Sequence, residues 1–346
     1  MEKMVSELLL WYEKSKRILP WRDKNNPYYT WISEIMLQQT RVEAVKSYFL
    51  RFIERLPDIE ALAACREDEL LKLWEGLGYY NRVRNMQKAA LILVENFGGK
   101  LPKDHTSLLK LPGIGSYTAG AIASIGHGQA YPAVDGNVLR VWSRLFGNFE
   151  DIGKDKTKKR VEEEVSRYIP PKRAGDFNQA LMELGATVCL PNTLPKCTQC
   201  PLSFTCIAYK KDLIDKLPVK EKKKKRKVEQ KTVLVIKNDN SFSLRKRPDK
   251  GLLAGLYEFP TLDGKLDEKE VVLWLKKQGI ESIRIKELEQ SKHIFSHVEW
   301  EMSAYHVWID ELSSVLKKDI IFVDCETIKK EYPIASALRA YKKYIK

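Results

Sequence analysis

Long apolar runs and a secretory leader are both missing from this chain. No hydrophobic stretch approaches the length of about 20 residues that a membrane-spanning helix needs. Residues 1–17 alternate Leu and Trp with Glu and Lys, which is typical of an amphipathic helix and not of a signal peptide. These absences argue against a helical membrane protein and an exported one, and we expect a cytoplasmic protein.

Acidic residues are scarce relative to basic ones. The 346 residues include 60 Lys and Arg against 46 Asp and Glu, which gives a formal net charge of +14. Such an excess favours a polyanionic partner. Part of it lies in Lys220–Lys231, where eight basic residues stand beside two Glu. A run of this kind is usually a solvated linker that touches phosphates without specificity.

No internal repeat is present, and the hydrophobic period changes once along the chain. Up to about residue 217 the apolar residues recur at helical spacing. Beyond the basic run the pattern alternates with the period of β-strands. We therefore expect a mainly α N-terminal region at 1–217, a linker at 218–230 and a smaller α+β domain at 231–346.

The second domain can be predicted in more detail. Residues 232–236 and 242–247 are strand-like and flank a polar turn, which predicts a hairpin. Residues 293–309 predict two more strands. Helices are predicted at 268–278 and 334–345.

Cysteine is rare and unevenly placed. Of the six, Cys65 and Cys325 stand alone and are predicted to be buried small apolar residues. The other four are spaced Cys-x7-Cys-x2-Cys-x5-Cys, and without a secretory signal this clustering favours a metal centre over disulfides. Four thiolates can hold zinc or a [4Fe–4S] cluster, and the spacing alone leaves both open with a lean toward iron–sulfur. The four are Cys189, Cys197, Cys200 and Cys206.

The most informative stretch is Leu-Pro-Gly-Ile-Gly-Ser-Tyr at 111–117. Gly113 and Gly115 predict a tight turn that exposes backbone N–H groups where the helix of Tyr117 begins, an arrangement that binds phosphate. A carboxylate, Asp135, follows about one helix later. Taken alone, such a turn is more often a packed connection between helices.

A second carboxylate, Glu34, lies in Trp-Ile-Ser-Glu-Ile-Met-Leu-Gln-Gln-Thr at 31–40. The pattern predicts the first turn of a helix capped by Thr30 or Ser33. A glutamate in that position is more often a surface residue that complements the helix dipole. To act as a general acid, Glu34 needs burial that raises its pKa by more than the helix N-terminus lowers it.

Four motifs in this order resemble the helix–hairpin–helix DNA glycosylases that carry an iron–sulfur cluster. Within that superfamily the chain resembles the MutY-type adenine DNA glycosylases, over nearly its whole length. The four motifs are the segments 33–40, 111–120 and 134–138 and the cysteine cluster at 189–206, with further matches at 76–80, 177–185, 252–260 and 295–297.

The resemblance implies a catalytic pair. Glu34 matches the acid that protonates N7 of adenine, and Asp135, oriented by Asn137, matches the carboxylate that stabilises the cationic sugar. Cleavage of a glycosidic bond is served by one protonated and one ionised carboxyl group. Tyr117 stands where strand-cleaving relatives place a Schiff-base lysine. Because tyrosine cannot form a Schiff base, we expect base excision without strand cleavage.

The resemblance also implies the DNA contacts. An adenine inside a duplex must be flipped out before it can be excised, and inserted side chains fill the gap in the stack. The family uses further residues to read 8-oxoguanine on the opposite strand. The implied partner is double-stranded DNA with adenine opposite 8-oxoguanine or guanine, bound by a nucleoid-associated monomer. The matching residues are Gln39, Thr40, Tyr79, Gly113, Gly115, Phe295, Ser296 and His297.

The cofactor and the second domain follow from the same resemblance. The four clustered cysteines match the ligands of a [4Fe–4S] cluster, with one departure. Seven residues (190–196) separate the first two cysteines where the family has six. The second domain resembles a Nudix-like domain, but residues 251–290 lack the catalytic Glu array that holds magnesium. We therefore interpret it as a lesion-recognition domain.

Three other hypotheses stay open. A glycosylase with another mismatch or lesion specificity would more often lack the C-terminal domain. A non-catalytic iron–sulfur DNA-binding protein would not need both Glu34 and Asp135. A Nudix-type pyrophosphatase would need the missing catalytic array.

Overall fold

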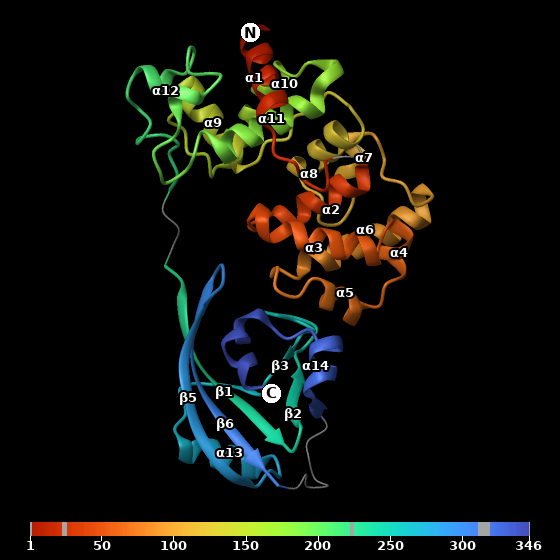
Figure 1. Ribbon diagram of the computed structural model, residues 1–346, viewed down its shortest axis with the longest axis vertical. Coiled ribbons are helices and arrows are strands. Elements are labelled where there is room, and N and C mark those ends of the chain that lie inside the picture. The colour runs from red at the N-terminus through yellow and green to blue at the C-terminus, as the bar shows by residue number, and fades with distance from the viewer. Residues whose placement is uncertain (1, 23–25, 222–224, 311–318, 346) are drawn as a thin grey trace. The chain divides into compact units, whose positions relative to one another are not determined.

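The structure is a computed structural model that describes residues 2–22, 26–221, 225–310 and 319–345. The chain divides into two compact units. The first comprises Met1–Cys65 and Asn81–Lys222, and the second comprises Arg66–Tyr80 and Lys223–Lys346. The first is helical, as predicted for residues 1–217, and the second holds the sheet (Figure 1). The assignment of residues 66–80 to the second unit had no counterpart in the sequence patterns.

The first unit is built from short and medium helices. The π-helical stretch η1 continues α8, and η2 and η3 are single 3₁₀ turns. In chain order the elements are α1 (Glu2–Ser15), α2 (Pro27–Leu37), α3 (Val42–Arg55), α4 (Ile59–Ala64), α6 (Asn81–Phe97), α7 (His105–Leu109), α8 (Ser116–Ala121), η1 (Ile122–Gly126), α9 (Gly136–Phe146), α10 (Asp155–Ser166), η2 (Pro171–Arg173), α11 (Ala174–Thr187), η3 (Cys197–Gln199) and α12 (Ile207–Lys210).

Helices α1, α9 and α11 share one hydrophobic core. Its fully buried members include Leu8, Val138 and Phe177, one from each helix. Helix α9 is sharply bounded, because Asp135 caps its N-terminus and Gly147 ends it in a left-handed conformation with φ of 65°. This core positions Asp135 at the start of α9 and Glu183 and Gly185 near the end of α11.

The second unit contains a seven-stranded sheet. The main path of the sheet is β3-β2-β1-β6-β5, with β4 on β1 and β7 on β2. Strands β1 and β6 are parallel, and the other pairs are antiparallel. The elements are α5 (Glu67–Leu73), β1 (Lys227–Asn238), β2 (Ser241–Lys246), β3 (Tyr257–Glu258), β4 (Thr261–Asp263), α13 (Glu268–Lys277), β5 (Ser282–Ile294), β6 (Val298–Ile309), β7 (Ile320–Asp324), α14 (Cys325–Glu331) and the 3₁₀ helix η4 (Ser336–Tyr344).

The predicted elements of this unit are present, with shifted ends. The hairpin of β1 and β2 and the helix at 268–278 are confirmed. Strand β1 begins at Lys227, inside the predicted linker, because its first residues pair with β6 from Val298 onward. Strand β5 begins at Ser282, well before the predicted 293, and the helix predicted at 334–345 is of 3₁₀ type.

The two isolated cysteines are less buried than predicted. Both Cys65 and Cys325 are half-buried. Each lies at a helix end, Cys65 after α4 and Cys325 at the start of α14. Helix ends leave backbone groups for water to satisfy, so side chains there tend to keep some exposure. The prediction of fully buried thiols was therefore wrong.

Within the described ranges, none of the helices combines the length and the apolar composition that crossing a membrane requires.

Candidate active site

Helix α2 carries Glu34 in its interior and not in its first turn. The helix begins at Pro27, and the N-cap is Asn26, whose Oδ1 accepts from the backbone N–H of Tyr28 at 2.9 Å. The predicted caps were wrong: the hydroxyls of Thr30 and Ser33 donate to carbonyls in the preceding turn. The positive end of the helix therefore lies two turns away from Glu34, where its effect on the carboxyl group has fallen off.

Burial sets the protonation of Glu34. Its side chain is within the core, with 7% of the residue exposed. The Tyr117 hydroxyl, from the start of α8, donates a hydrogen bond to Glu34 Oε2. Burial raises the pKa of Glu34 to about 7, the bond from Tyr117 lowers it, and the charge of Asp135 raises it. The requirement that burial outweigh the lowering influences is met, so a large share of the Glu34 side chains is protonated near neutral pH.

Asp135 is held as the N-cap of α9. Its Oδ1 accepts from the backbone N–H groups of Asn137 at 2.9 Å and Val138 at 2.8 Å, and its Oδ2 accepts from Asn137 Nδ2 at 2.7 Å. Burial raises the pKa of Asp135 above its ordinary value, and these three bonds and the charge of Arg140 offset that rise only in part. The bonds stabilise the carboxylate and fix its direction. The predicted role of Asn137 as an orienting residue matches this geometry.

Arg140 was missed by the sequence patterns, although it supports Asn137. Its Nη2 donates to Asn137 Oδ1 at 2.9 Å and to Gly185 O at 2.8 Å, and its Nε donates to Cys189 O at 2.9 Å. Gly185 must be glycine here, because a Cβ would lie 2.6 Å from the Cβ of Asn137. In the sequence, the packing of Gly185 was indicated only by its place in the segment 177–185, which resembles the family.

Glu183 is the second residue that the sequence patterns missed. Its side chain is fully buried on α11, where it accepts from Arg17 Nε at 2.5 Å and from Arg22 Nη2 at 2.8 Å. Burial raises the pKa of Glu183, but the bonds and charges of Arg17 and Arg22 outweigh it, and the net pKa is lowered. A single acid in the apolar segment 177–185 was the available signal.

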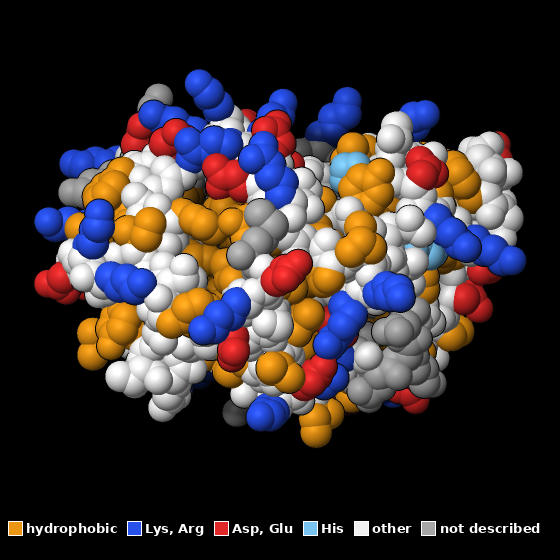
Figure 2. Space-filling view, turned by 90° about the horizontal axis from the view of Figure 1, so that it is seen from above, with side chains coloured by type: hydrophobic (Ala, Val, Ile, Leu, Met, Phe, Trp, Pro, Cys, Tyr) orange, Lys and Arg blue, Asp and Glu red, His pale blue; other side chains and the backbone are white. Residues whose placement is uncertain are grey.

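The turn at 111–117 has the predicted form. Gly113 has φ of 77°, and Gly115 is the N-cap of α8 without a side-chain cap bond. Both glycines are exposed, while Ile114 between them is buried. The backbone N–H groups at the start of α8 therefore face solvent, as a phosphate contact requires. Figure 2 shows Lys and Arg side chains spread over the face it views, among acidic and hydrophobic ones and not gathered in one patch.

Gln39 and Thr40 follow the C-terminal end of α2. Gln39 is exposed and has φ of 59°, a left-handed conformation that is uncommon for a residue other than glycine. The Thr40 N–H donates to Leu37 O at 3.2 Å and closes the turn.

In the second unit, Phe295, Ser296 and His297 form the turn between β5 and β6. The Phe295 N–H donates to Val298 O at 2.9 Å, and the Phe295 ring packs edge-on against Trp300 with 5.1 Å between ring centroids. Ser296 and His297 are exposed. The Tyr79 hydroxyl lies 3.2 Å from Ser296 Oγ, so the structure brings these two predicted DNA-binding residues together within one unit.

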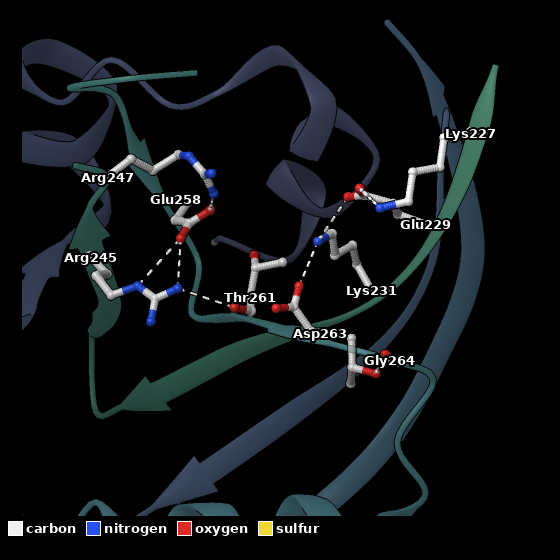
Figure 3. Close-up of polar contacts among 10 residues, drawn as sticks. Lys227, Glu229, Lys231, Arg245, Arg247, Glu258, Thr261, Asp263 and Gly264 are labelled. Carbon is white, nitrogen blue, oxygen red and sulfur yellow. Dashed lines mark hydrogen bonds and ion pairs between the residues drawn. The ribbon is translucent and has the colours of Figure 1, made fainter. Parts of the chain in front are cut away.

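Both carboxylate oxygens of Glu258, at the end of β3, form ion pairs with arginine side chains. Glu258 is 1% exposed, Arg245 Nη2 donates to its Oε1 at 2.8 Å, and Arg247 bonds to its Oε2. Figure 3 shows both guanidinium groups converging on this carboxylate, and shows Lys231 between Glu229 and Asp263. With both oxygens engaged, Glu258 is unsuited to hold magnesium, which fits a Nudix-like domain without hydrolase chemistry.

The four clustered cysteines line one cavity in the first unit, together with Arg144. Arg144 Nη1 donates to Cys189 Sγ at 3.4 Å. Burial raises the pKa of Cys200 to about 12. Among the described residues, no group of three His, Cys, Asp or Glu side chains is arranged to hold a single metal ion. Four thiols that line one cavity are a donor set of the kind that an iron–sulfur cluster uses.

Two protein families match the two parts of the chain. Residues 32–171 match the family described as HhH-GPD superfamily base excision DNA repair protein. Residues 232–344 match the family described as NUDIX domain. The predicted fold class, a helix–hairpin–helix glycosylase region with a smaller Nudix-like α+β domain, is confirmed.

Curated relatives cover most of the chain. An adenine DNA glycosylase of Buchnera aphidicola is 39% identical over 84% of this chain and 84% of the relative. The adenine DNA glycosylase of Mus musculus is 35% identical over 88% of this chain and 70% of the relative. Among solved structures, a thermostable thymine-DNA glycosylase is 29% identical with a TM-score of 0.54, and covers 61% of this chain and 98% of its own. A non-covalent endonuclease III–DNA complex has 26% identity and a TM-score of 0.52, with 60% of this chain and 94% of its own covered.

Proposed function

Because this chain belongs to the adenine DNA glycosylase family, we propose that it excises adenine opposite 8-oxoguanine or guanine from duplex DNA without cutting the strand. The observation that carries the proposal is the buried Glu34, which is protonated to a large share near neutral pH and interacts electrostatically with Asp135. An acid and a carboxylate in one site are what cleavage of an N-glycosidic bond uses.

The proposed mechanism divides the work between the two carboxyl groups. Tyr117 donates to Glu34 Oε2, so Oε1 carries the proton that passes to N7 of the leaving adenine. As the bond to the base breaks, positive charge develops on the sugar. Asp135, held by three hydrogen bonds, then lies in place as the negative charge that stabilises it. Water completes the hydrolysis.

The absence of strand cleavage follows from Tyr117. A lyase needs an amine that forms a Schiff base with the sugar, and the phenol of Tyr117 cannot do so. Its hydroxyl is moreover committed to Glu34. Tyr117 therefore supports the acid, and the reaction ends at the abasic site.

We further propose that Cys189, Cys197, Cys200 and Cys206 hold a [4Fe–4S] cluster. The support is the shared cavity and the Arg144 guanidinium beside Cys189. Such a cluster would cross-link the loop 189–206. The seven-residue first spacing is accommodated in the loop before η3, where Leu194 is exposed.

We assign the DNA contacts to both units. Gly113 and Gly115 contact a backbone phosphate, and Gln39 and Thr40 enter the stack beside the flipped base. Tyr79 with Phe295, Ser296 and His297 reads the 8-oxoguanine, and the pairing of Tyr79 with Ser296 supports a shared role. We propose that the protein acts on DNA as a monomer, in the cytoplasm and at the nucleoid.

One assay tests the proposal. A duplex with a single adenine opposite 8-oxoguanine is incubated with the protein, and half of the sample is then treated with hot alkali. We expect strand breaks only after alkali. Breaks without alkali would contradict the absence of lyase activity, and no breaks in either half would favour a non-catalytic DNA-binding protein. Excision of thymine or of an oxidised pyrimidine instead would favour another specificity.

Glu34→Gln separates chemistry from binding. The variant keeps the shape of the side chain but has no proton to give, so excision should fall by at least 1,000-fold, roughly the range of general acid catalysis. Binding to the same duplex should remain within a few-fold. Glu54→Gln, an exposed glutamate on α3, serves as the matched control. Retained excision by Glu34→Gln would remove Glu34 from the mechanism.

A further inference from the structure

The C-terminal end of α2, where the catalytic helix passes into the exposed Gln39 turn, is held by one side chain from α6. We propose that Arg82 is a positioning residue that fixes the Gln39 turn against the DNA stack and thereby speeds extrusion of the target adenine. This inference rests on the proposed function and adds to it a residue that none of the sequence motifs indicated.

Arg82 satisfies the carbonyl groups that the helix end leaves open. Its Nη1 lies 2.7 Å from Ile35 O, 2.6 Å from Gln38 O and 3.4 Å from Met36 O. Helix α2 ends at Leu37, so the carbonyls of its last turn have no partners within the helix. A guanidinium group at this end also meets the negative end of the helix dipole. One guanidinium group thus contacts the carbonyl groups of three residues at this helix end.

The held segment ends next to a strained residue. Gln39 has φ of 59°, and Arg82 bonds to the carbonyl of the residue immediately before it. A left-handed conformation is unfavourable for a residue other than glycine. The turn itself is closed by the 3.2 Å bond from the Thr40 N–H to Leu37 O and the 3.4 Å contact from Thr40 Oγ1 to Gln38 O. Without Arg82, the backbone at Gln38 and Gln39 is free to relax and to redirect the Gln39 side chain.

A side chain that enters a base stack needs a rigid support. Inserting a side chain into the stack breaks base stacking, so a side chain whose backbone moves aside does not push the target base out. Glu34 lies on the same helix, which is anchored in the core independently of Arg82. Loss of Arg82 should therefore slow extrusion while leaving the acid in place.

Two substrates distinguish extrusion from chemistry. The first is the duplex with adenine opposite 8-oxoguanine. The second carries the same pair beside a mismatched base pair, which weakens the stack that holds the adenine. We expect Arg82→Gln to slow single-turnover excision at least tenfold on the first substrate and less than threefold on the mismatched one. Arg82→Lys, which keeps the charge and can still reach a carbonyl, should fall between Arg82→Gln and the unchanged protein.

A measurement without substrate tests the structural step. Hydrogen exchange of the Thr40 amide should become at least tenfold faster in Arg82→Gln, while amides inside α2 exchange as before. Lys88→Gln removes an exposed cation from the same helix α6 and should change neither rate. Thermal unfolding shows whether each variant is folded.

The outcomes are separable from those of the proposed function. Equal slowing on both substrates, or no slowing on either, overturns the role of Arg82 in extrusion. An unchanged hydrogen-exchange rate at the Thr40 amide in Arg82→Gln would contradict the proposal that Arg82 holds the turn. If the unchanged protein excises adenine from neither substrate, the proposed function fails, and the exchange result still decides whether Arg82 holds the turn.

Discussion

The Tyr117 hydroxyl donates to Oε2 of Glu34, and this one bond keeps the pKa of the proposed catalytic acid below the value that burial alone would give. The two residues come from different helices, 83 positions apart. The bond therefore couples Tyr117, which we propose stands where lyases place a lysine, to Glu34, which we propose protonates the base. The pH at which the enzyme works depends on both.

Tyr117→Phe should shift the pH dependence of excision. Removing a bond that lowers the pKa should raise the pKa of Glu34 from its present value of about 7. A hydrogen bond to a charged group is worth about 1.5–3 kcal/mol, so the alkaline fall in single-turnover rate should move up by about one to two pH units. Tyr131→Phe, an exposed tyrosine, is the control. A midpoint that stays in place or moves down would contradict the coupling.

Glu34→Gln should make the protein more stable, and more so at higher pH. The folded-state pKa of Glu34 is raised from its ordinary value of 4.5 to about 7. The folded protein then binds this proton more tightly than the unfolded chain, so wild-type stability falls as pH rises through this interval, by about 3 kcal/mol in all. Glutamine does not titrate. In urea titrations, the difference in unfolding free energy between Glu34→Gln and the unchanged protein should grow by that amount between about pH 4 and pH 8. The control variant Glu54→Gln should show no such growth.

Glu183→Gln should destabilise the protein by about 3 kcal/mol, because it leaves Arg17 and Arg22 without the buried carboxylate they share. The pKa of Glu183 is lowered in the folded protein. Its contribution is therefore present above the unfolded-state pKa and is lost as pH falls through the folded-state value. Urea unfolding should show a gap between variant and wild type that closes in acid. The exposed Glu163→Gln is the control, and a loss as large in Glu163→Gln would point to net charge as the cause.

Gly185→Ala should slow excision about tenfold or more while leaving DNA affinity nearly unchanged. The added Cβ would lie 2.6 Å from the Cβ of Asn137, whose amide holds Asp135 Oδ2 at 2.7 Å. Single-turnover rates check the prediction. If the effect passes through Asn137, Gly185→Ala should add little further slowing to Asn137→Ala. Fully additive slowing would place the cause elsewhere.

The cysteine cluster should bind iron and not zinc. Purified protein should absorb visible light and contain iron and sulfide together, and Cys200→Ser should lose both. Loss of the cluster should lower the unfolding temperature, because the loop at 189–206 would lose its cross-link. Cys325→Ser, in the second unit, should keep the iron. A colourless protein with stoichiometric zinc would overturn the assignment.

Features that depend on neighbouring residues could be predicted from the sequence. The Gly113 turn, the cysteine spacing and the order of the motifs are local patterns, and each predicts its structure or its family directly. The hairpin of β1 and β2 belongs to this class. The start of β1 does not, because Lys227 becomes strand only by pairing with Val298.

The protonation of the candidate site could not be predicted in this way. By sequence, Glu34 is an acid near a helix start, where an exposed and ionised side chain is expected. Asn26 and Pro27 move that start two turns away, and Tyr117 of α8, which also contacts Met182 of α11, donates a hydrogen bond to the side chain. Glu183 and Arg140 likewise acquire their partners only through packing of distant helices.

The sequence by itself determined which chemical groups are available: two carboxyl groups, a tyrosine in place of a lysine, four clustered thiols and an exposed glycine turn. Only the tertiary structure decided that burial raises the pKa of Glu34 to about 7 and that three hydrogen bonds hold the carboxyl group of Asp135. The reason is that the pKa depends on how much water the fold removes and on which charges it brings near, and both are supplied by residues far away in the chain.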